Sequence, residues 1–123
     1  MLIFSNIKYP ILVYFCAMQI LDGKIVSQSV KDKVKERVSL FKKEGKKTPH
    51  LAAVLVGTNG ASETYVASKV KNCEEVGFKS SLIRFDDTIA EAGLITAIEK
   101  LNSNDDVDGI LVQLPLPKQI NEE

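Results

Sequence analysis

The sequence predicts an α/β protein with three layers, in which helices cover both faces of a mostly parallel sheet. The chain has 123 residues, 45% of them hydrophobic, which suits one small domain with a core of its own. Helical and strand-like patterns alternate along it, as they do in proteins with a parallel sheet. Two of the strand-like segments are almost wholly apolar, which is typical of strands buried on both faces.

The first predicted helix covers residues 24–44. Its apolar residues fall at i, i+4, i+8 and i+11, one stripe of an amphipathic helix, and they are Val30, Val34, Val38 and Phe41. We expect this stripe to face the rest of the domain.

The first predicted strand and the helix after it form one unit. Residues 51–56 read LAAVLV and end at Gly57, which indicates a buried strand. We expect a helix at residues 63–76, with Ser62 as its N-cap and Gly77 as a left-handed residue after its end.

Two further strands and one helix follow. Residues 80–85 are less apolar than the first strand, so we expect them nearer an edge of the sheet. Thr88 and Glu91 have the spacing of a capping box, which predicts a helix that reaches about Leu101. Residues 109–113 are predicted to form a third buried strand. Ligands of such sheets bind at the carboxyl ends of the strands.

Tyr65 and Lys69 are four residues apart on the second predicted helix and therefore lie one turn apart on one side of it. They border the expected core stripe of Val66, Val70 and Cys73 by roughly 100° of rotation. A lysine at such a boundary can exchange a proton with a ligand, and a tyrosine ring offers a flat surface for an aromatic one. The alternative is a solvated lysine beside a half-buried tyrosine.

Gln113 ends the third predicted strand, where ligands bind. A glutamine there needs hydrogen-bond partners, and it could orient Lys69 or hold a polar edge of a ligand. The alternative is a polar residue that only terminates a strand.

A nucleotide-binding interpretation of the segment from Gly57 to Gly60 has little support. The G-x-G-x-x-G fingerprint is absent, and Asp86 and Asp87 come closest to a ribose-binding acid. Short-chain dehydrogenases also use Y-x-x-x-K, but there the motif follows a complete dinucleotide-binding unit.

Charge and cysteine content exclude several classes of protein. Basic and acidic residues number 16 each, which argues against a nucleic-acid binder. Cys16 and Cys73 form no C-x-x-C pair, so we expect free thiols in a reducing, cytoplasmic compartment, and with His50 as the only histidine no metal site. The apolar run at residues 11–17 is too short to span a membrane.

Three segments together resemble the amino-terminal half of the bifunctional methylenetetrahydrofolate dehydrogenase/methenyltetrahydrofolate cyclohydrolase family. They are LDGK at 21–24, VLVGTNGASETYVASKVKNCEEVGF at 54–78 and GILVQLPLP at 109–117. The likeness begins near Met18. We therefore expect residues 18–123 to be the amino-terminal catalytic, folate-binding domain, and residues 1–17 to be a non-native or mis-started leader. The alternative for residues 8–15 is a strand added to the edge of the sheet.

The resemblance implies an enzyme that oxidises 5,10-methylenetetrahydrofolate with a nicotinamide cofactor, usually NADP, and hydrolyses the methenyl product to 10-formyltetrahydrofolate. It implies that Lys69 is the general acid/base, that Tyr65 stacks on the folate and that Gln113 tunes the lysine. It also implies a substrate pocket formed by Ser62, Tyr65, Val66, Ala67, Ser68, Lys69, Val112, Gln113, Leu114 and Pro115. We expect no metal cofactor, and the resemblance suggests a cytoplasmic homodimer that serves one-carbon metabolism and purine biosynthesis.

This sequence departs from the family pattern in two ways. The Rossmann domain that binds NADP in the family is missing, and so is the pterin-binding aspartate, which lies downstream of the LVQLPLP segment. Asp106-Val107-Asp108-Gly109 is only a look-alike, because it precedes that strand. The competing interpretation is a non-catalytic regulatory or binding module on the same scaffold, which would have no reason to keep Lys69.

Overall fold

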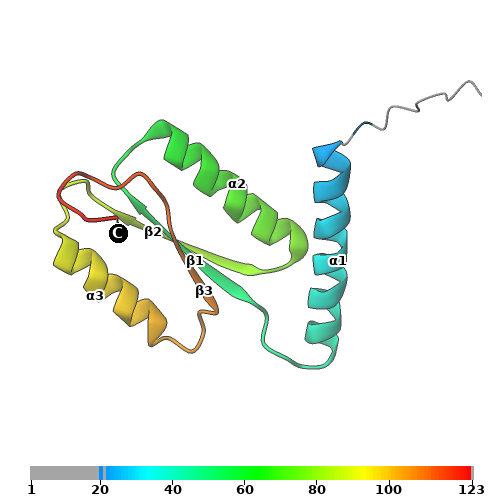
Figure 1. Ribbon diagram of the computed structural model, residues 1–123. Helices are drawn as coiled ribbons and strands as arrows, with labels where there is room; N and C mark the ends of the chain where they lie inside the picture. Colours follow the sequence, from blue (N-terminus) through cyan, green and yellow to red (C-terminus); the bar gives the residue numbers. More distant parts are fainter. Residues whose placement is uncertain (1–19, 21, 123) are drawn as a thin grey trace, which may run out of the picture.

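The computed structural model describes residue 20 and residues 22–122 (Figure 1). Helices and strands alternate, as the sequence predicted. In chain order the elements are α1 (Gly23–Lys43), β1 (His50–Val56), α2 (Gly60–Val76), β2 (Lys79–Phe85), α3 (Glu91–Asn102) and β3 (Gly109–Val112). The segment interpreted as a leader, residues 1–17, lies outside the described residues, and Cys16 lies there with it.

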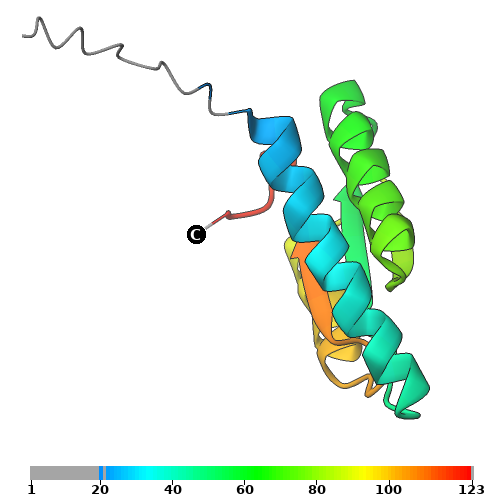
Figure 2. The same ribbon diagram turned by 90° about the vertical axis from the view of Figure 1, so that its right-hand side faces the viewer.

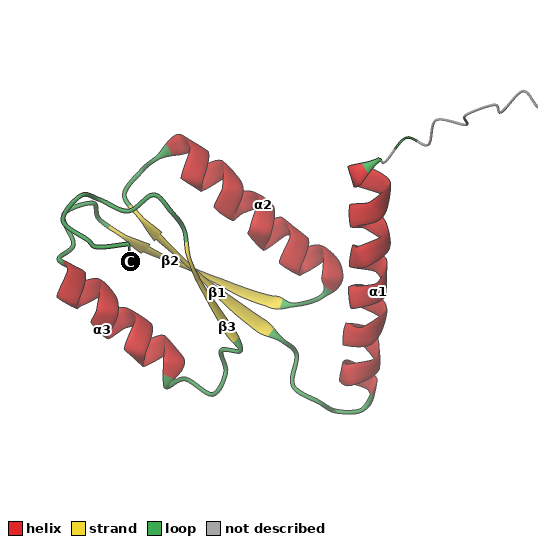
Figure 3. Ribbon diagram, viewed as in Figure 1, coloured by secondary structure: helices red, strands yellow, loops and turns green. Residues whose placement is uncertain are grey.

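The strands form a parallel sheet in the order β2-β1-β3. Figure 3 shows α2 on one face of this sheet and α3 on the other. The alternation of side chains along β1 explains both contacts. Ala53 and Leu55 pack against Val66 of α2, whereas Val54 and Val56 belong to the cluster that contains Leu94 of α3. The three-layer α/β/α prediction is confirmed.

The two outer strands differ in how well the sequence predicted them. The less apolar β2 lies at an edge, as expected. Residues 109–113 were expected to form a buried strand. Among the described residues the strand is present, but the prediction that it is buried was wrong. β3 is the other outer strand, and its residues are only half-buried. Its apolar composition matches that of a central strand, so composition alone could not show that one of its sides is open.

Helix α2 begins earlier than predicted, because a different residue caps it. The side chain of Asn59 accepts hydrogen bonds from the backbone N–H groups of Ala61 and Ser62, so Asn59 is the N-cap and Ser62 is not. The other end is as predicted, since Gly77 has a left-handed backbone with φ of 86°.

The capping box predicted before α3 is absent. Ala90 occupies the N-cap position and makes no side-chain cap, and Glu91 is the first helical residue. The Thr88 hydroxyl instead donates to the Asp86 carboxylate at 2.7 Å, closing a local turn. A short polar side chain can satisfy a turn as readily as a helix end, so the spacing was not decisive.

Helix α1 packs chiefly against α2, and Figures 1 and 2 show the two helices side by side. Its predicted apolar stripe is only partly covered. Val38 is 4% exposed, but Val30 is 55% exposed. None of the described helices is long and apolar enough to cross a bilayer.

Cys73 is a free thiol in the buried side of α2. Burial, followed by the nearby carboxylate of Glu74, raises the pKa of this thiol. It is therefore a structural residue at neutral pH rather than a reactive one.

The capping contacts can be tested by mutation. Asn59→Ala removes the acceptor of two helix N–H groups, so we expect it to lower the free energy of unfolding by about 1 kcal/mol. Thr88→Ala, which removes only an exposed turn contact, should cost less than about 0.5 kcal/mol. Urea unfolding followed by circular dichroism measures both. A loss for Asn59→Ala no larger than that for Thr88→Ala would show that Asn59 does not cap α2.

Candidate active site

The three groups predicted to act together lie together at the carboxyl ends of β1 and β3. The Lys69 ammonium on α2 donates a hydrogen bond to the Gln113 side-chain oxygen at 2.9 Å. The same ammonium lies 5.6 Å from the centre of the Tyr65 ring. The side chains of Lys69 and Gln113, which are 44 positions apart in the sequence, are therefore in direct contact.

The rotation of α2 about its own axis places Tyr65 and Lys69 at the border of the interface between helix and sheet, and not within it. Val66, between them, is 1% exposed and packs on Leu55 of β1. With this residue anchored, the neighbouring positions must lie at the border of the core. Tyr65 is 62% exposed, so one face of its ring is open to a flat ligand.

The side-chain amide of Gln113 has only one orientation that satisfies its neighbours. Its backbone N–H donates to Val54 O at 2.9 Å, which extends the pairing of β1 and β3 by one residue. Its Nε2 donates to the Leu114 carbonyl at 2.7 Å. Because Nε2 of Gln113 faces a carbonyl oxygen, Oε1 faces Lys69 and accepts a hydrogen bond from its ammonium.

Ser62 braces the same carbonyl from the other side. Its side chain is fully buried, at 2% exposed, and its hydroxyl donates to Leu114 O at 3.2 Å. The oxygen of Leu114 therefore accepts from both Ser62 and Gln113. This oxygen therefore links the first turn of α2 to the segment after β3. Gln113, which donates to the same oxygen, in turn accepts a hydrogen bond from Lys69.

The partners of Lys69 in the described part of the chain are uncharged. They are an amide oxygen and an aromatic ring. An ammonium carries three donors, and the Gln113 oxygen occupies one of them. The others remain for a ligand that stacks on Tyr65, so the site can hold a flat molecule and deliver or accept a proton at its edge.

The other residues predicted to line the pocket divide into three groups by their exposure. Ala67 and Ser68 are exposed on α2. Leu114 is 50% exposed, and Pro115 beyond it is also exposed. Val112 is half-buried and packs on the α3 side of the sheet. Ser62 and Val66, in contrast, lie buried beneath the site and support it.

The alternative nucleotide site has an unsuitable lining. A hollow of about 420 Å³ lies next to Gly57 at the ends of β1 and β2. Asp86 and Asp87 line it together with Arg84, and Arg84 already pairs with Glu63 at 2.9 Å. Two carboxylates beside one neutralised guanidinium disfavour a phosphate group.

The look-alike segment before β3 lies away from the site, as expected. Asp106 and Asp108 contact His50, the first residue of β1, and so belong to the amino ends of the strands. Among the described residues, no three acidic, histidine or cysteine side chains gather as metal ligands would.

Sequence reasoning missed the part played by Leu114. Its carbonyl joins Ser62 and Gln113, and no side-chain pattern marks a backbone oxygen. The one available signal was Ser62 itself, a small polar residue at a position of α2 that faces the core.

Fold and site together define an α/β domain that presents a lysine–glutamine pair beside an exposed tyrosine at the carboxyl ends of its strands. The family model described as tetrahydrofolate dehydrogenase/cyclohydrolase, catalytic domain, matches residues 21–123, and the chain belongs to this family. The resemblance seen in the three sequence segments is thereby confirmed.

Relatives with known sequences and structures agree. The bifunctional protein FolD of Christiangramia forsetii is 59% identical over 104 residues, which are 85% of this chain and 35% of that protein. The FolD structure from Campylobacter jejuni has a TM-score of 0.83 at 46% identity and covers 86% of this chain and 37% of that one. The Trypanosoma brucei enzyme, solved with NADP cofactor and inhibitor, has a TM-score of 0.79 at 27% identity, over 85% of this chain and 35% of that one. This chain therefore spans little more than a third of the length of these relatives.

The hydrogen bond from Ser62 to Leu114 O can be tested by measuring the stability of the protein. Ser62→Ala removes a part-buried hydrogen bond to Leu114 O, so we expect a loss of about 1 kcal/mol in the free energy of unfolding. Ser68→Ala, on the exposed side of the same helix, should change it by less than about 0.5 kcal/mol. Denaturant unfolding of the two variants gives the comparison. Equal effects would mean that Ser62 does not hold the segment after β3.

Proposed function

We propose that this chain is the folate-binding, acid/base half of an enzyme that oxidises 5,10-methylenetetrahydrofolate with NADP and hydrolyses the methenyl product to 10-formyltetrahydrofolate. One observation carries the proposal: the 2.9 Å contact between Lys69 and Gln113 beside the open ring of Tyr65. A relative that covers this contact region is named a bifunctional enzyme, methylenetetrahydrofolate dehydrogenase/cyclohydrolase.

Each side chain has a distinct task in this proposal. The exposed Tyr65 ring stacks on the flat pterin part of the substrate. Lys69 delivers a proton to the substrate, or removes one, at the carbon–nitrogen bonds that change during hydrolysis. Gln113, held by Leu114, keeps the ammonium within reach and accepts one of its hydrogen bonds. No metal takes part in this scheme.

The described residues do not fit the nicotinamide cofactor. The glycine fingerprint of dinucleotide sites is missing, and the hollow at Gly57 carries two carboxylates. We propose that NADP, which accepts the hydride when bound, is held by a part of the parent protein outside these residues.

The remaining properties rest on the family resemblance alone. We propose that the parent protein is a cytoplasmic homodimer that supplies one-carbon units for purine biosynthesis and that its partners include neither nucleic acid nor membrane. The equal numbers of acidic and basic residues and the free Cys73 are consistent with this.

Removing the proton-carrying group tests the proposal. In the full-length protein, Lys69→Met should lower the cyclohydrolase kcat by at least about 100-fold, because the general acid/base is lost. Lys71→Met, two residues along α2 and exposed, is the matched control and should leave kcat unchanged. Hydrolysis of methenyltetrahydrofolate is followed by its absorbance. If Lys69→Met keeps the parent rate, the chain is better explained as a non-catalytic module on the same scaffold.

The stacking role of Tyr65 makes a separate prediction. Tyr65→Phe keeps the aromatic face and should leave KM for the folate within about twofold, whereas Tyr65→Ala should raise KM by about tenfold through loss of the stacking surface. Steady-state kinetics of the two variants separate the effects. Equal KM values for both variants would place the pterin elsewhere.

A further inference from the structure

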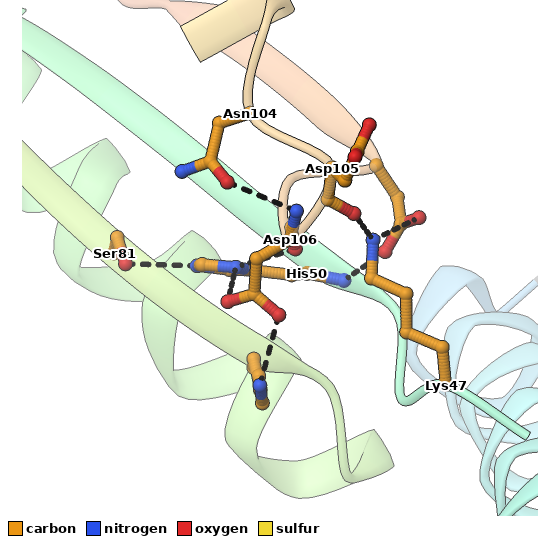
Figure 4. Close-up of polar contacts among 8 residues, drawn as sticks. Lys47, His50, Ser81, Asn104, Asp105 and Asp106 are labelled. Carbon is orange, nitrogen blue, oxygen red and sulfur yellow. Dashed lines mark hydrogen bonds and ion pairs between the residues drawn. The ribbon is translucent and has the colours of Figure 1, made fainter.

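A second cluster of polar side chains lies at the amino ends of the strands, and Figure 4 shows its contacts. The contact of Lys69 with Gln113 lies at the other end of the sheet, after β3. The centre of the second cluster is His50, the first residue of β1. His50 Nε2 lies 2.8 Å from the hydroxyl of Ser81 on β2, and Nδ1 lies 3.2 Å from the carboxylate of Asp106, in the turn before β3. A serine, a histidine and an aspartate are thus joined in one line.

The surroundings of the imidazole settle which nitrogen carries the proton in its neutral form. Nδ1 faces the backbone oxygen of Asp106 at 2.9 Å as well as its carboxylate, and both groups can only accept. Nδ1 is therefore the donor. Nε2 is left with a free electron pair and accepts the hydrogen bond of the Ser81 hydroxyl. This is the arrangement of a nucleophile, its base and the group that orients the base.

Asp106 is suited to stabilise a positive charge on the ring. Its carboxylate also accepts from Lys79 at 3.1 Å. That hydrogen bond, followed by the charge of Lys79, lowers the pKa of Asp106, so the group is ionised near neutral pH. When Nε2 takes a proton, the resulting imidazolium lies beside an anion.

Neighbouring hydrogen bonds fix the positions of His50 and Asp106. The backbone N–H of His50 donates to Asp108 at 2.9 Å, and Lys47 donates to the same carboxylate at 2.9 Å. The Asn104 side chain accepts from the backbone of Asp106. The His50 side chain is 10% exposed, which shields the base, and Ser81 is half-buried on an outer strand.

We propose that Ser81 is an activated nucleophile, with His50 as its base, and that it reacts with small, unhindered acyl esters. The Ser81 oxygen forms a bond to the carbonyl carbon while its proton passes to His50 Nε2. The bond from that carbon to the leaving oxygen then breaks, and Nε2 returns the proton to the departing alcohol. Water, activated by the same nitrogen, removes the acyl group from Ser81, so the net reaction is ester hydrolysis. Because Ser81 is half-buried, we expect short acyl groups to react best.

A purely structural cluster would make the same contacts, because it ties β1, β2 and the turn before β3 together. The two explanations differ in the reactivity of the serine. Ser80 is the matched control, since it is the preceding residue on the same strand and its side chain points to the other face of the sheet.

The full-length protein is treated with a fluorophosphonate, and the adduct is located by mass spectrometry of its peptides. We expect Ser81 to be labelled at least about tenfold faster than Ser80, with labelling absent in Ser81→Ala and unchanged in Ser80→Ala. His50→Gln and Asp106→Asn should each slow labelling by about tenfold or more. Asp106 is exposed, so its variant tests the idea even if His50→Gln fails to fold. Labelling of Ser81 no faster than of Ser80, or equal to the parent rate in Asp106→Asn, would overturn the proposal.

The labelling of Ser81 is independent of the activity proposed for the folate site. Ser81→Ala should keep the parent cyclohydrolase activity, and Lys69→Met should keep the parent labelling rate. Failure of one proposal therefore leaves the other intact.

Discussion

The carbonyl oxygen of Leu114 is the contact on which the proposed site depends. It accepts hydrogen bonds from Ser62 at the start of α2 and from Gln113 at the end of β3. The second bond turns the amide oxygen of Gln113 toward Lys69. The buried hydroxyl of Ser62 is costly to leave unpaired, and Leu114 O is the acceptor that it finds. The position of the ammonium follows from these hydrogen bonds and does not depend on a bound ligand.

The fold brings these groups together by ordinary packing. Val66 inserts against Leu55 and sets the rotation of α2, while the parallel pairing of β1 and β3 brings Gln113 to the same end of the sheet. Parallel sheets bind ligands at this end, where the loops leave the strands. The geometry therefore places the lysine–glutamine pair where this class of sheet binds its ligands, within the residues that the family model matches.

The sequence predicted the parts of the fold that depend on pattern. Apolar runs located the strands, Gly77 ended α2, and the spacing of Tyr65 and Lys69 placed both on one side of that helix. It did not predict the cap of α3, because Thr88 satisfies a local turn instead. It also did not show that β3 lies at an edge, since the half-burial of a strand depends on neighbours that composition does not specify.

Contacts between distant residues were the least predictable. His50 and Asp106 are 56 positions apart, so no local pattern joins them, and a single histidine pointed only to the question of a metal ligand. The most direct test of the whole account is a crystal structure of the full-length protein with a folate analogue bound. The account predicts the pterin ring stacked on Tyr65, with Lys69 hydrogen-bonded to Gln113 and reaching the ligand. A ligand bound elsewhere, or side chains of Tyr65, Lys69 and Gln113 that face different directions, would contradict it.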